Sequence, residues 1–431
     1  MTTPHIVIAG GGYVGMYTAL GLQRELRKGE ARVTVIDPRS AMTYQPFLPE
    51  ASAGSLEPRH VVVPLRKTLK RCKVVTARIV SINHAAHSVR VEPMGGAPYD
   101  LAYDQLVVAL GSVARTLPIP GLAQHGMGFK QIEEAIALRN HVLDRLDVAA
   151  SVGDEATRRA ALTFVFVGGG YAGVEALAEI EDMARFATRY YASVSQADLR
   201  FVLVEASNRI LPEVGPDMGR YTVDRLTDRR IEVRLETRLN SCVDRHVMLS
   251  DGEEFDADTI VWTAGVKANP VLAASDLPCD DKGRVKAHPN LRVEDLEAAW
   301  AAGDNAAVPD LTHPGQLCSP SAQHAVRQAR VLAANVIRSL RGEPLEDYKH
   351  KHAGSVASLG LYKGVAQVYG VKLRGFPAWF MHRTYHMSRM PTFNKKVRVV
   401  LDWTLALFFR RDVVSLGSLQ RARDDFERAN R

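Results

Sequence analysis

Cysteine is scarce in this sequence of 431 residues, and its four copies lie far apart. Cys72, Cys242, Cys279 and Cys318 form no CxxC pair and no spacing typical of metal ligands. We therefore predict neither a disulfide framework nor a zinc or other metal site. The pattern favours reduced thiols, as in a cytosolic protein.

Long apolar runs are missing as well. The most apolar stretch, 397–409, is interrupted by Arg398 and Asp402, whereas a membrane-spanning helix needs about 20 apolar residues. The N-terminus reads MTTPHIVIAGGG, without a basic segment or a cleavage site, which predicts no export signal. We expect no transmembrane segment.

The composition is that of a globular protein with two or three domains. Hydrophobic residues make up 46% and charged residues 24%, and no low-complexity tract interrupts them. The formal net charge is +7, but no recognition helix, zinc module or aromatic–basic strand accompanies it. We therefore predict no nucleic-acid partner and a negatively charged membrane surface instead.

A glycine-rich turn follows the first predicted strand. The strand His5–Ala9 leads into GGGYVG, a helical stretch, and a second strand that ends at Asp37. In this dinucleotide-binding fingerprint Gly10 makes the tight turn, Gly12 lets the backbone approach a pyrophosphate, and Gly15 allows close helix–strand packing. Asp37 is predicted to bond the ribose hydroxyls.

The same pattern returns in the middle of the chain. Gly168, Gly170 and Gly173 lie between the strand LTFVFV and a long helix, and the next strand ends at Glu205 after a longer interval. One such turn alone also fits an ordinary loop, but two in full context predict two dinucleotides. A carboxylate at Glu205 repels a 2′-phosphate, which favours NADH, although nearby Arg209 leaves NADPH open.

Three further strand ends assign the two nucleotides by resemblance. AWAAGDNAAV places Asp304 after a strand and before a helix starting near Ser321, and it resembles the late motif of two-dinucleotide flavoproteins, whose aspartate bonds the flavin ribityl chain. That resemblance implies FAD in the first unit and NADH in the second. Gly111 and Gly265 resemble crossovers close to a cofactor, and they also fit plain turns.

The stretch TYQPFLPEASAGSLEPRHVVVPLR, residues 43–66, strongly resembles the type II NADH:quinone oxidoreductases. These are single-chain FAD enzymes on the membrane surface. Disulfide reductases and sulfide:quinone reductases carry paired cysteines near the flavin, and this stretch has none. The resemblance therefore implies direct transfer from flavin to a membrane quinone, with menaquinone favoured. Tyr44 and Gln45 are expected either at the flavin edge or as loop packing.

A second segment with this resemblance is SPSAQHAVRQA. Ala322, Gln323 and Ala325 match the family's AQxAxQ helix start, which contributes to the quinone pocket. The resemblance implies a quinone and catalytic role for Gln323, with Arg327 or Gln328 replacing the second glutamine. The alternative is that Gln323 caps the helix.

Glu175, in GVEA, is the predicted proton donor for quinone reduction. The family's glutamate at this motif lies between nicotinamide and flavin. Without the resemblance, a first-turn acid that stabilises the helix dipole is the more common explanation. Some bacterial members place a lysine near the quinone, and His382 is a candidate for that position.

The segment NKKVRVVLDWTLALFFRRD predicts an interfacial helix. Apolar residues recur at helical spacing from Val397 to Phe408, and basic residues, Lys395, Lys396, Arg410 and Arg411, mark both ends. Together with the membrane quinone that the resemblance implies, this helix predicts a peripheral protein on the cytoplasmic side of the cell membrane. A core-facing helix or a homodimer contact is the alternative.

The predicted fold class is α/β, with two Rossmann-like domains of the two-dinucleotide flavoprotein kind and a C-terminal membrane-docking region. The expected divisions are 1–118 and 284–345 for FAD, 119–283 for NADH, and 346–431 for membrane or dimer contacts. The resemblance implies a non-proton-pumping NADH:quinone oxidoreductase. Two alternatives are an NAD(P)H-dependent reductase of another acceptor and a redox sensor resembling apoptosis-inducing-factor-type flavoproteins.

Overall fold

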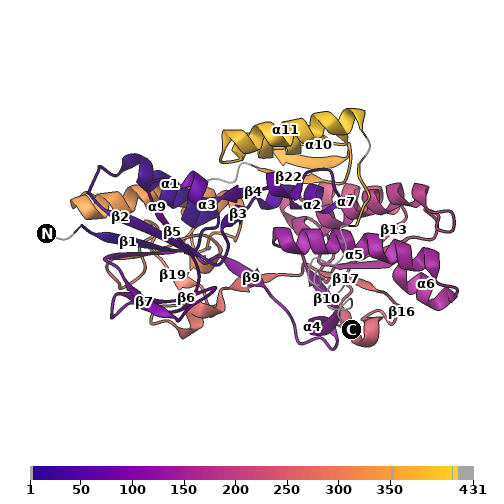
Figure 1. The fold of residues 1–431 in the computed structure, drawn as a ribbon, viewed down its shortest axis with the longest axis horizontal. Helices are drawn as coiled ribbons and strands as arrows, with labels where there is room; N and C mark the ends of the chain where they lie inside the picture. Colours follow the sequence, from indigo (N-terminus) through magenta and orange to yellow (C-terminus); the bar gives the residue numbers. More distant parts are fainter. Residues whose placement is uncertain (1–2, 351–353, 410, 416–431) are drawn as a thin grey trace, which may run out of the picture. The chain divides into compact units, whose positions relative to one another are not determined.

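The computed structural model describes residues 3–350, 354–409 and 411–415, and the chain forms two compact units (Figure 1). Among these residues, unit 1 contains 3–43, 62–113 and 266–350, and unit 2 contains 44–61, 114–265 and 354–415. Within the described ranges no helix combines the length and the apolar character needed to cross a bilayer.

The compact units divide the chain elsewhere than the predicted domains. The boundary predicted after residue 118 lies inside unit 2, and the boundary predicted after residue 283 lies inside unit 1. Cys242 N–H donates to Pro120 O (2.9 Å) within unit 2, and Lys286 N–H donates to Pro278 O (2.8 Å) within unit 1. The C-terminal residues group with unit 2, as does the inserted segment 44–61.

Unit 1 is built on a seven-stranded sheet whose core strands are parallel. Its strands, in spatial order, are β20 (Ala299–Ala301), β8 (Gln105–Val108), β1 (His5–Ala9), β2 (Arg32–Asp37), β5 (Lys73–Asn83), β6 (Ser88–Pro93) and β7 (Tyr99–Ala102). β1 is buried at every position, as expected for a central parallel strand. α1 (Tyr13–Glu25) packs on α9 (Ala322–Arg341) so closely that a Cβ on Gly21 would lie 2.6 Å from the Ala333 Cβ.

Unit 2 contains a five-stranded parallel sheet. Its strands, in spatial order, are β10 (Gly126–Gly128), β17 (Thr259–Trp262), β11 (Thr163–Val167), β12 (Arg200–Val204) and β13 (Ile231–Arg234). Side chains alternate between two cores, since Phe164 and Phe166 face one cluster and Val165 and Val167 the other. The first cluster includes α5 (Ile132–Ser151) and α7 (Tyr171–Ala187), and the second includes the antiparallel strands β14 (Leu239–Ser241) and β15 (His246–Leu249).

The C-terminal part of unit 2 adds a small sheet and two helices. β22 (Gly354–Ser358), β23 (Gly364–Val368) and β24 (Val371–Arg374) form antiparallel hairpins. α10 (Phe376–Arg389) packs on these strands, and α11 (Phe393–Phe408) follows. Both helices are drawn in yellow tones in Figure 1.

Candidate functional site

The first glycine turn forms as predicted at the carboxyl end of β1. Gly10 has φ +110°, and a Cβ on Gly15 would lie 1.8 Å from Gly10 O, so both positions require glycine. At Gly12, by contrast, no described atom lies within 4 Å of the place a Cβ would take. Gly12 is the N-cap of α1, which carries neither a side-chain cap nor an acidic residue in its first turn. An open, uncapped helix start of this kind fits a pyrophosphate.

The second turn repeats this arrangement in unit 2. Gly168 has φ +116°, and a Cβ on Gly173 would lie 1.9 Å from Gly168 O. The space beside Gly170, the N-cap of α7, is likewise clear of the described atoms. This helix start also has no side-chain cap and no first-turn acid. Each unit therefore offers its own anion-binding turn.

The acids at the ends of β2 and β12 bond to the turns themselves. Asp37 Oδ2 accepts from Gly11 N–H at 2.7 Å, and Glu205 Oε2 accepts from Gly169 N–H at 2.6 Å. Burial raises the pKa of Asp37 against the opposing backbone bonds from Gly11 and Arg39. The two acids thus occupy matching places although their intervals from the turn are 26 and 36 residues. Their contacts with ribose hydroxyls stay a prediction.

A hydrogen-bonded cluster surrounds the predicted late motif in unit 1. Ser112 Oγ donates to Asp304 Oδ2 (2.6 Å), and Gly111 N–H donates to Asn305 Oδ1 (2.8 Å). Asn305 is fully buried and also donates to Val108 O at 3.1 Å. The cluster joins the ends of neighbouring strands, as expected for the cofactor edge of a parallel sheet. Ser112 and Asn305 had no distinguishing signal in the sequence.

The helix α9 places the predicted quinone residues in different surroundings. Gln323 Oε1 lies 3.0 Å from His350 Nε2, and Arg327 Nη1 donates to Gln323 O at 2.9 Å. Gln328 is 1% exposed and accepts from Gly303 N–H at 2.7 Å, so it anchors α9 to the Asp304 turn.

The alternative that Gln323 caps this helix is wrong. Ser321 is the N-cap residue of α9, and its Oγ accepts from His324 N–H at 3.2 Å. A serine in this position is a preferred cap because its hydroxyl oxygen reaches an unpaired N–H of the first turn. The roles of Gln323, Arg327 and Gln328 toward a quinone stay predictions.

In unit 2 a threonine supports the second glycine turn. Thr263 Oγ1 donates to Val167 O at 2.9 Å and lies 3.2 Å from Gly168 O. Gly265, two residues later, has φ +86° and accepts from Arg115 N–H at 3.1 Å. The approach of Gly265 to a cofactor stays a prediction. Thr263 itself was missed.

Glu175 is buried where α7 meets β22. It is the fifth residue of the helix, so the expectation of a first-turn acid is wrong. Its Oε1 accepts from Ser358 N–H at 2.8 Å and lies 3.1 Å from His382 Nε2. Burial lowers the pKa of His382, but the hydrogen bond and charge of Glu175 outweigh it, so the pKa is raised. His382 thus lies beside Glu175, and its place near a quinone stays a prediction.

The stretch after Thr43 packs against the two C-terminal helices. Tyr44 Oη donates to His386 O at 2.8 Å, and Phe47 meets the Trp403 ring edge-on at 5.6 Å between centroids. Glu50, 1% exposed, accepts from Arg383 and from Trp403 Nε1, each at 2.9 Å. This stretch therefore serves as packing in unit 2, and a contact of Tyr44 or Gln45 with the flavin stays a prediction.

A second carboxyl is buried beside this network. Glu179 is 1% exposed, and its Oε1 lies 3.4 Å from Ser358 Oγ. Burial, reinforced by the charge of Glu50, raises the pKa of Glu179 to about 7. Glu179 therefore keeps its proton to a higher pH than an exposed glutamate does.

Together, the paired glycine turns and their strand-end acids define a protein with two dinucleotide-binding units. The model of the pyridine nucleotide-disulphide oxidoreductase family matches residues 4–329. A type II NADH:quinone oxidoreductase of Staphylococcus aureus is 30% identical over 384 residues, which cover 88% of this chain and 93% of that protein. The chain belongs to the pyridine nucleotide-disulphide oxidoreductase family, and within it to the type II NADH:quinone oxidoreductases.

Two further similarities extend along nearly the whole chain. A probable NADH dehydrogenase of Dictyostelium discoideum is 28% identical over 419 residues, covering 95% of this chain and 91% of that one. NDH2 from Plasmodium falciparum, solved in complex with NADH, matches with a TM-score of 0.88 at 17% identity, covering 96% of this chain and all 100% of that chain. The structural match supports the fold and confirms the predicted α/β class with dinucleotide-binding domains, while the membrane-docking C-terminal region stays a prediction.

Proposed function

We propose that this protein is a non-proton-pumping NADH:quinone oxidoreductase that carries FAD in unit 1 and takes NADH in unit 2. The observation that supports this proposal is the repeated open helix start at Gly12 and at Gly170. In each unit the acid at the end of the next strand accepts a hydrogen bond from the glycine turn. Glu205 favours NADH because its carboxylate would repel the extra phosphate of NADPH.

The residues of the chain bind, orient and supply protons. FAD, when bound, accepts a hydride and passes on two electrons. Gly12 and Asp304 would hold it in unit 1, and Gly170 and Glu205 would hold NADH in unit 2. Quinone reduction takes up two protons, and Glu175 is the group we assign to deliver one from its Oε atoms. His382 Nε2 lies 3.1 Å from Glu175 Oε1, where the ring can stabilise the carboxylate that remains after the proton has left.

The proposal is tested by steady-state NADH oxidation with menaquinone and ubiquinone analogues, with NADPH in parallel. We expect rapid turnover with a quinone and a preference for NADH. Turnover confined to soluble dyes would indicate a reductase of another acceptor. A long-lived reduced state with bound NAD would instead indicate a redox sensor.

The replacement Gln323→Ala is expected to raise the quinone KM roughly fivefold to tenfold, the effect of losing about one hydrogen bond. The rate of flavin reduction by NADH should not change, and stopped-flow absorbance separates the two steps. Gln316→Ala, an exposed glutamine of the same unit, is the matched control. Equal losses with every acceptor would contradict a quinone-specific role.

A peripheral position on the cytoplasmic side of the membrane belongs to the same proposal. α11 faces unit 2 through Val399, Asp402 and Trp403, where Asp402 Oδ2 lies 2.6 Å from His60 Nδ1. Its other face exposes large apolar side chains: Phe393 (82%), Leu401 (54%), Leu405 (56%), Leu407 (70%) and Phe408 (78%). A contiguous exposed apolar face of this kind fits a lipid surface.

The predicted basic ends of this helix are used in part by the protein itself. Lys395 Nζ donates to Arg59 O at 2.5 Å, and Lys396 Nζ donates to Ser388 O at 2.7 Å. Arg410 lies outside the described residues. The apolar face therefore carries more of the docking proposal than the charges do.

Vesicle binding tests the docking face. Leu405→Glu should weaken co-sedimentation with phosphatidylglycerol-containing vesicles roughly tenfold, because the leucine loses its apolar burial and the acid is repelled. Met94→Glu makes the same charge change at an 86%-exposed position of unit 1 and serves as the control. Equal weakening by both variants would contradict a role for this face.

A further inference from the structure

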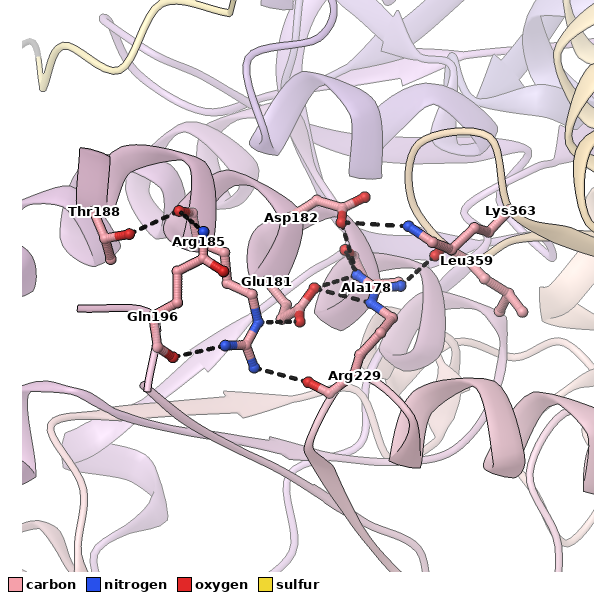
Figure 2. Close-up of polar contacts among 9 residues, drawn as sticks. All are labelled: Ala178, Glu181, Asp182, Arg185, Thr188, Gln196, Arg229, Leu359 and Lys363. Atoms are coloured by element: carbon pink, nitrogen blue, oxygen red, sulfur yellow. Dashed lines mark hydrogen bonds and ion pairs between the residues drawn. The ribbon is translucent and has the colours of Figure 1, made fainter. Parts of the chain in front are cut away.

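A buried group of charges joins α7 to the turn that follows β22, and Figure 2 shows its members. The Glu181 carboxylate, whose side chain is 1% exposed, pairs with both Arg185 and Arg229. Arg229 is itself 12% exposed and also lies 3.0 Å from Asp182 Oδ1. Removing these charges from water costs free energy, so well-placed ion pairs and hydrogen bonds have to compensate for the lost hydration.

Arg229 fixes the backbone of the turn from one side. Its guanidinium donates to Leu359 O and, at 2.9 Å, to Ala178 O. One planar fork therefore joins the carboxylates of α7 to a carbonyl of the hairpin. A lysine cannot make these several bonds at once, since its ammonium is a single point of charge.

Asp182 fixes the same turn from the other side. Its Oδ2 accepts from Leu361 N–H at 2.7 Å. Between them lies Gly360, with φ +89°, where a Cβ would stand 2.2 Å from Asp182 Oδ2. The turn is thus held at Leu359 O and at Leu361 N–H, on either side of Gly360, and Gly360 leaves no room for a side chain next to the helix.

Three acids on one face of α7 contact this hairpin. Glu175, Glu179 and Asp182 follow one another at intervals of four and three residues, which places them along one side of the helix. Glu175 and Glu179 meet Ser358 through its N–H and its Oγ. Ser358 directly precedes Leu359, so the bond from Arg229 to Leu359 O also restricts where the Ser358 N–H can point.

We propose that Arg229 is a positioning residue for Glu175. It holds the turn after β22 against α7, and through Ser358 it fixes the carboxylate that we assign to proton delivery. The effect on proton delivery rests on the proposed function. The positioning itself concerns only the contact between Ser358 N–H and the Glu175 carboxylate.

The experiment measures amide hydrogen exchange and flavin kinetics on the FAD-loaded enzyme. In Arg229→Ala we expect at least roughly tenfold faster exchange at Ser358 and Leu361, because their acceptors are no longer held. Flavin reoxidation by quinone should slow roughly tenfold, as displacement of a reacting group by a fraction of an ångström does, while the KM for NADH stays unchanged. Arg225→Ala, which removes an exposed surface pair with Asp228, is the control.

Two more variants complete the test. Arg229→Lys keeps the positive charge but loses the planar guanidinium, so we expect an intermediate effect on exchange and on reoxidation. If Arg229→Ala does not fold, Arg229→Lys and Gly360→Ala test the positioning role in its place. The double variant Arg229→Ala with Glu175→Gln should reoxidise no slower than Glu175→Gln alone, because both changes act on one group. Additive losses would overturn the proposal.

The two proposals fail in different ways. If Glu175→Gln keeps the full quinone rate, proton delivery by Glu175 is wrong, and the exchange at Ser358 still tests the positioning. If Ser358 exchange in a folded Arg229→Ala protein matches the wild type, or quickens equally in Arg225→Ala, the positioning role is overturned.

Discussion

Replacing Gly12 by alanine is expected to give a folded protein that no longer retains FAD. Gly12 has φ −72°, outside the left-handed region that favours glycine, and its Cβ would enter space free of other described atoms apart from its chain neighbours. The added methyl therefore costs the fold little. It would stand where the dinucleotide backbone has to approach the helix start.

The loss of affinity should be large. Each hydrogen bond from a backbone N–H to a charged phosphate contributes about 1.5–3 kcal/mol, so disturbing even two weakens FAD binding at least about 100-fold. Flavin absorbance of the purified protein measures retention, and circular dichroism reports the fold. Gly95→Ala, at an exposed loop glycine with equally open space, should remain yellow. A yellow Gly12→Ala protein with normal affinity would contradict the assignment of FAD to unit 1.

The replacement Glu175→Gln is expected to slow quinone reduction by roughly 100-fold while flavin reduction by NADH continues. General acid catalysis contributes about 10²–10⁴-fold, and glutamine keeps the bond from Ser358 N–H without a transferable proton. Hydride transfer itself requires no acid or base, so the first half-reaction is spared. Stopped-flow spectroscopy records both half-reactions through the flavin absorbance.

The matched control for Glu175 is a carboxylate of the same unit that touches no residue of this hairpin. Glu155→Gln serves, since the Glu155 side chain is 60% exposed and pairs with Arg158 on the surface. It should leave both half-reactions unchanged. If Glu175→Gln slowed both half-reactions equally, a structural role would explain the loss better than proton delivery.

The elements closest to the nucleotide turns could be predicted from the sequence because their signals are local. The strand His5–Ala9, the bends at Gly10 and Gly168, and the helix start after Ser321 depend on neighbouring residues only. Glycine at a positive φ and serine at a helix cap are chemical requirements that a sequence displays directly.

The supporting residues could not be predicted because their partners are distant in the chain. Asn305 is 194 residues from Gly111, and Arg229 is 130 residues from Leu359. Nothing about an isolated asparagine or arginine indicates which carbonyl it will reach. The position of Glu175 was misjudged for a smaller reason, since the helix starts four residues earlier at Tyr171.

The amphipathic segment near the C-terminus was predicted as a helix, but its spacing alone left two orientations open. The structure shows which side of the helix faces the protein, because the indole N–H of Trp403 donates to Glu50, 353 positions away in the chain. One side of the helix is committed to the protein by such contacts. The remaining apolar side is what makes lipid binding testable.

The matched bonds of Asp37 and Glu205 have a consequence for how such chains are compared. The interval between turn and acid is ten residues longer in the second unit, 36 against 26. Both carboxylates nevertheless accept from the backbone N–H of the second glycine in the turn. A search that fixes this gap in advance would discard the later copy. The segment between turn and acid can therefore differ in length, provided that the strand brings its final residue back to the glycine turn.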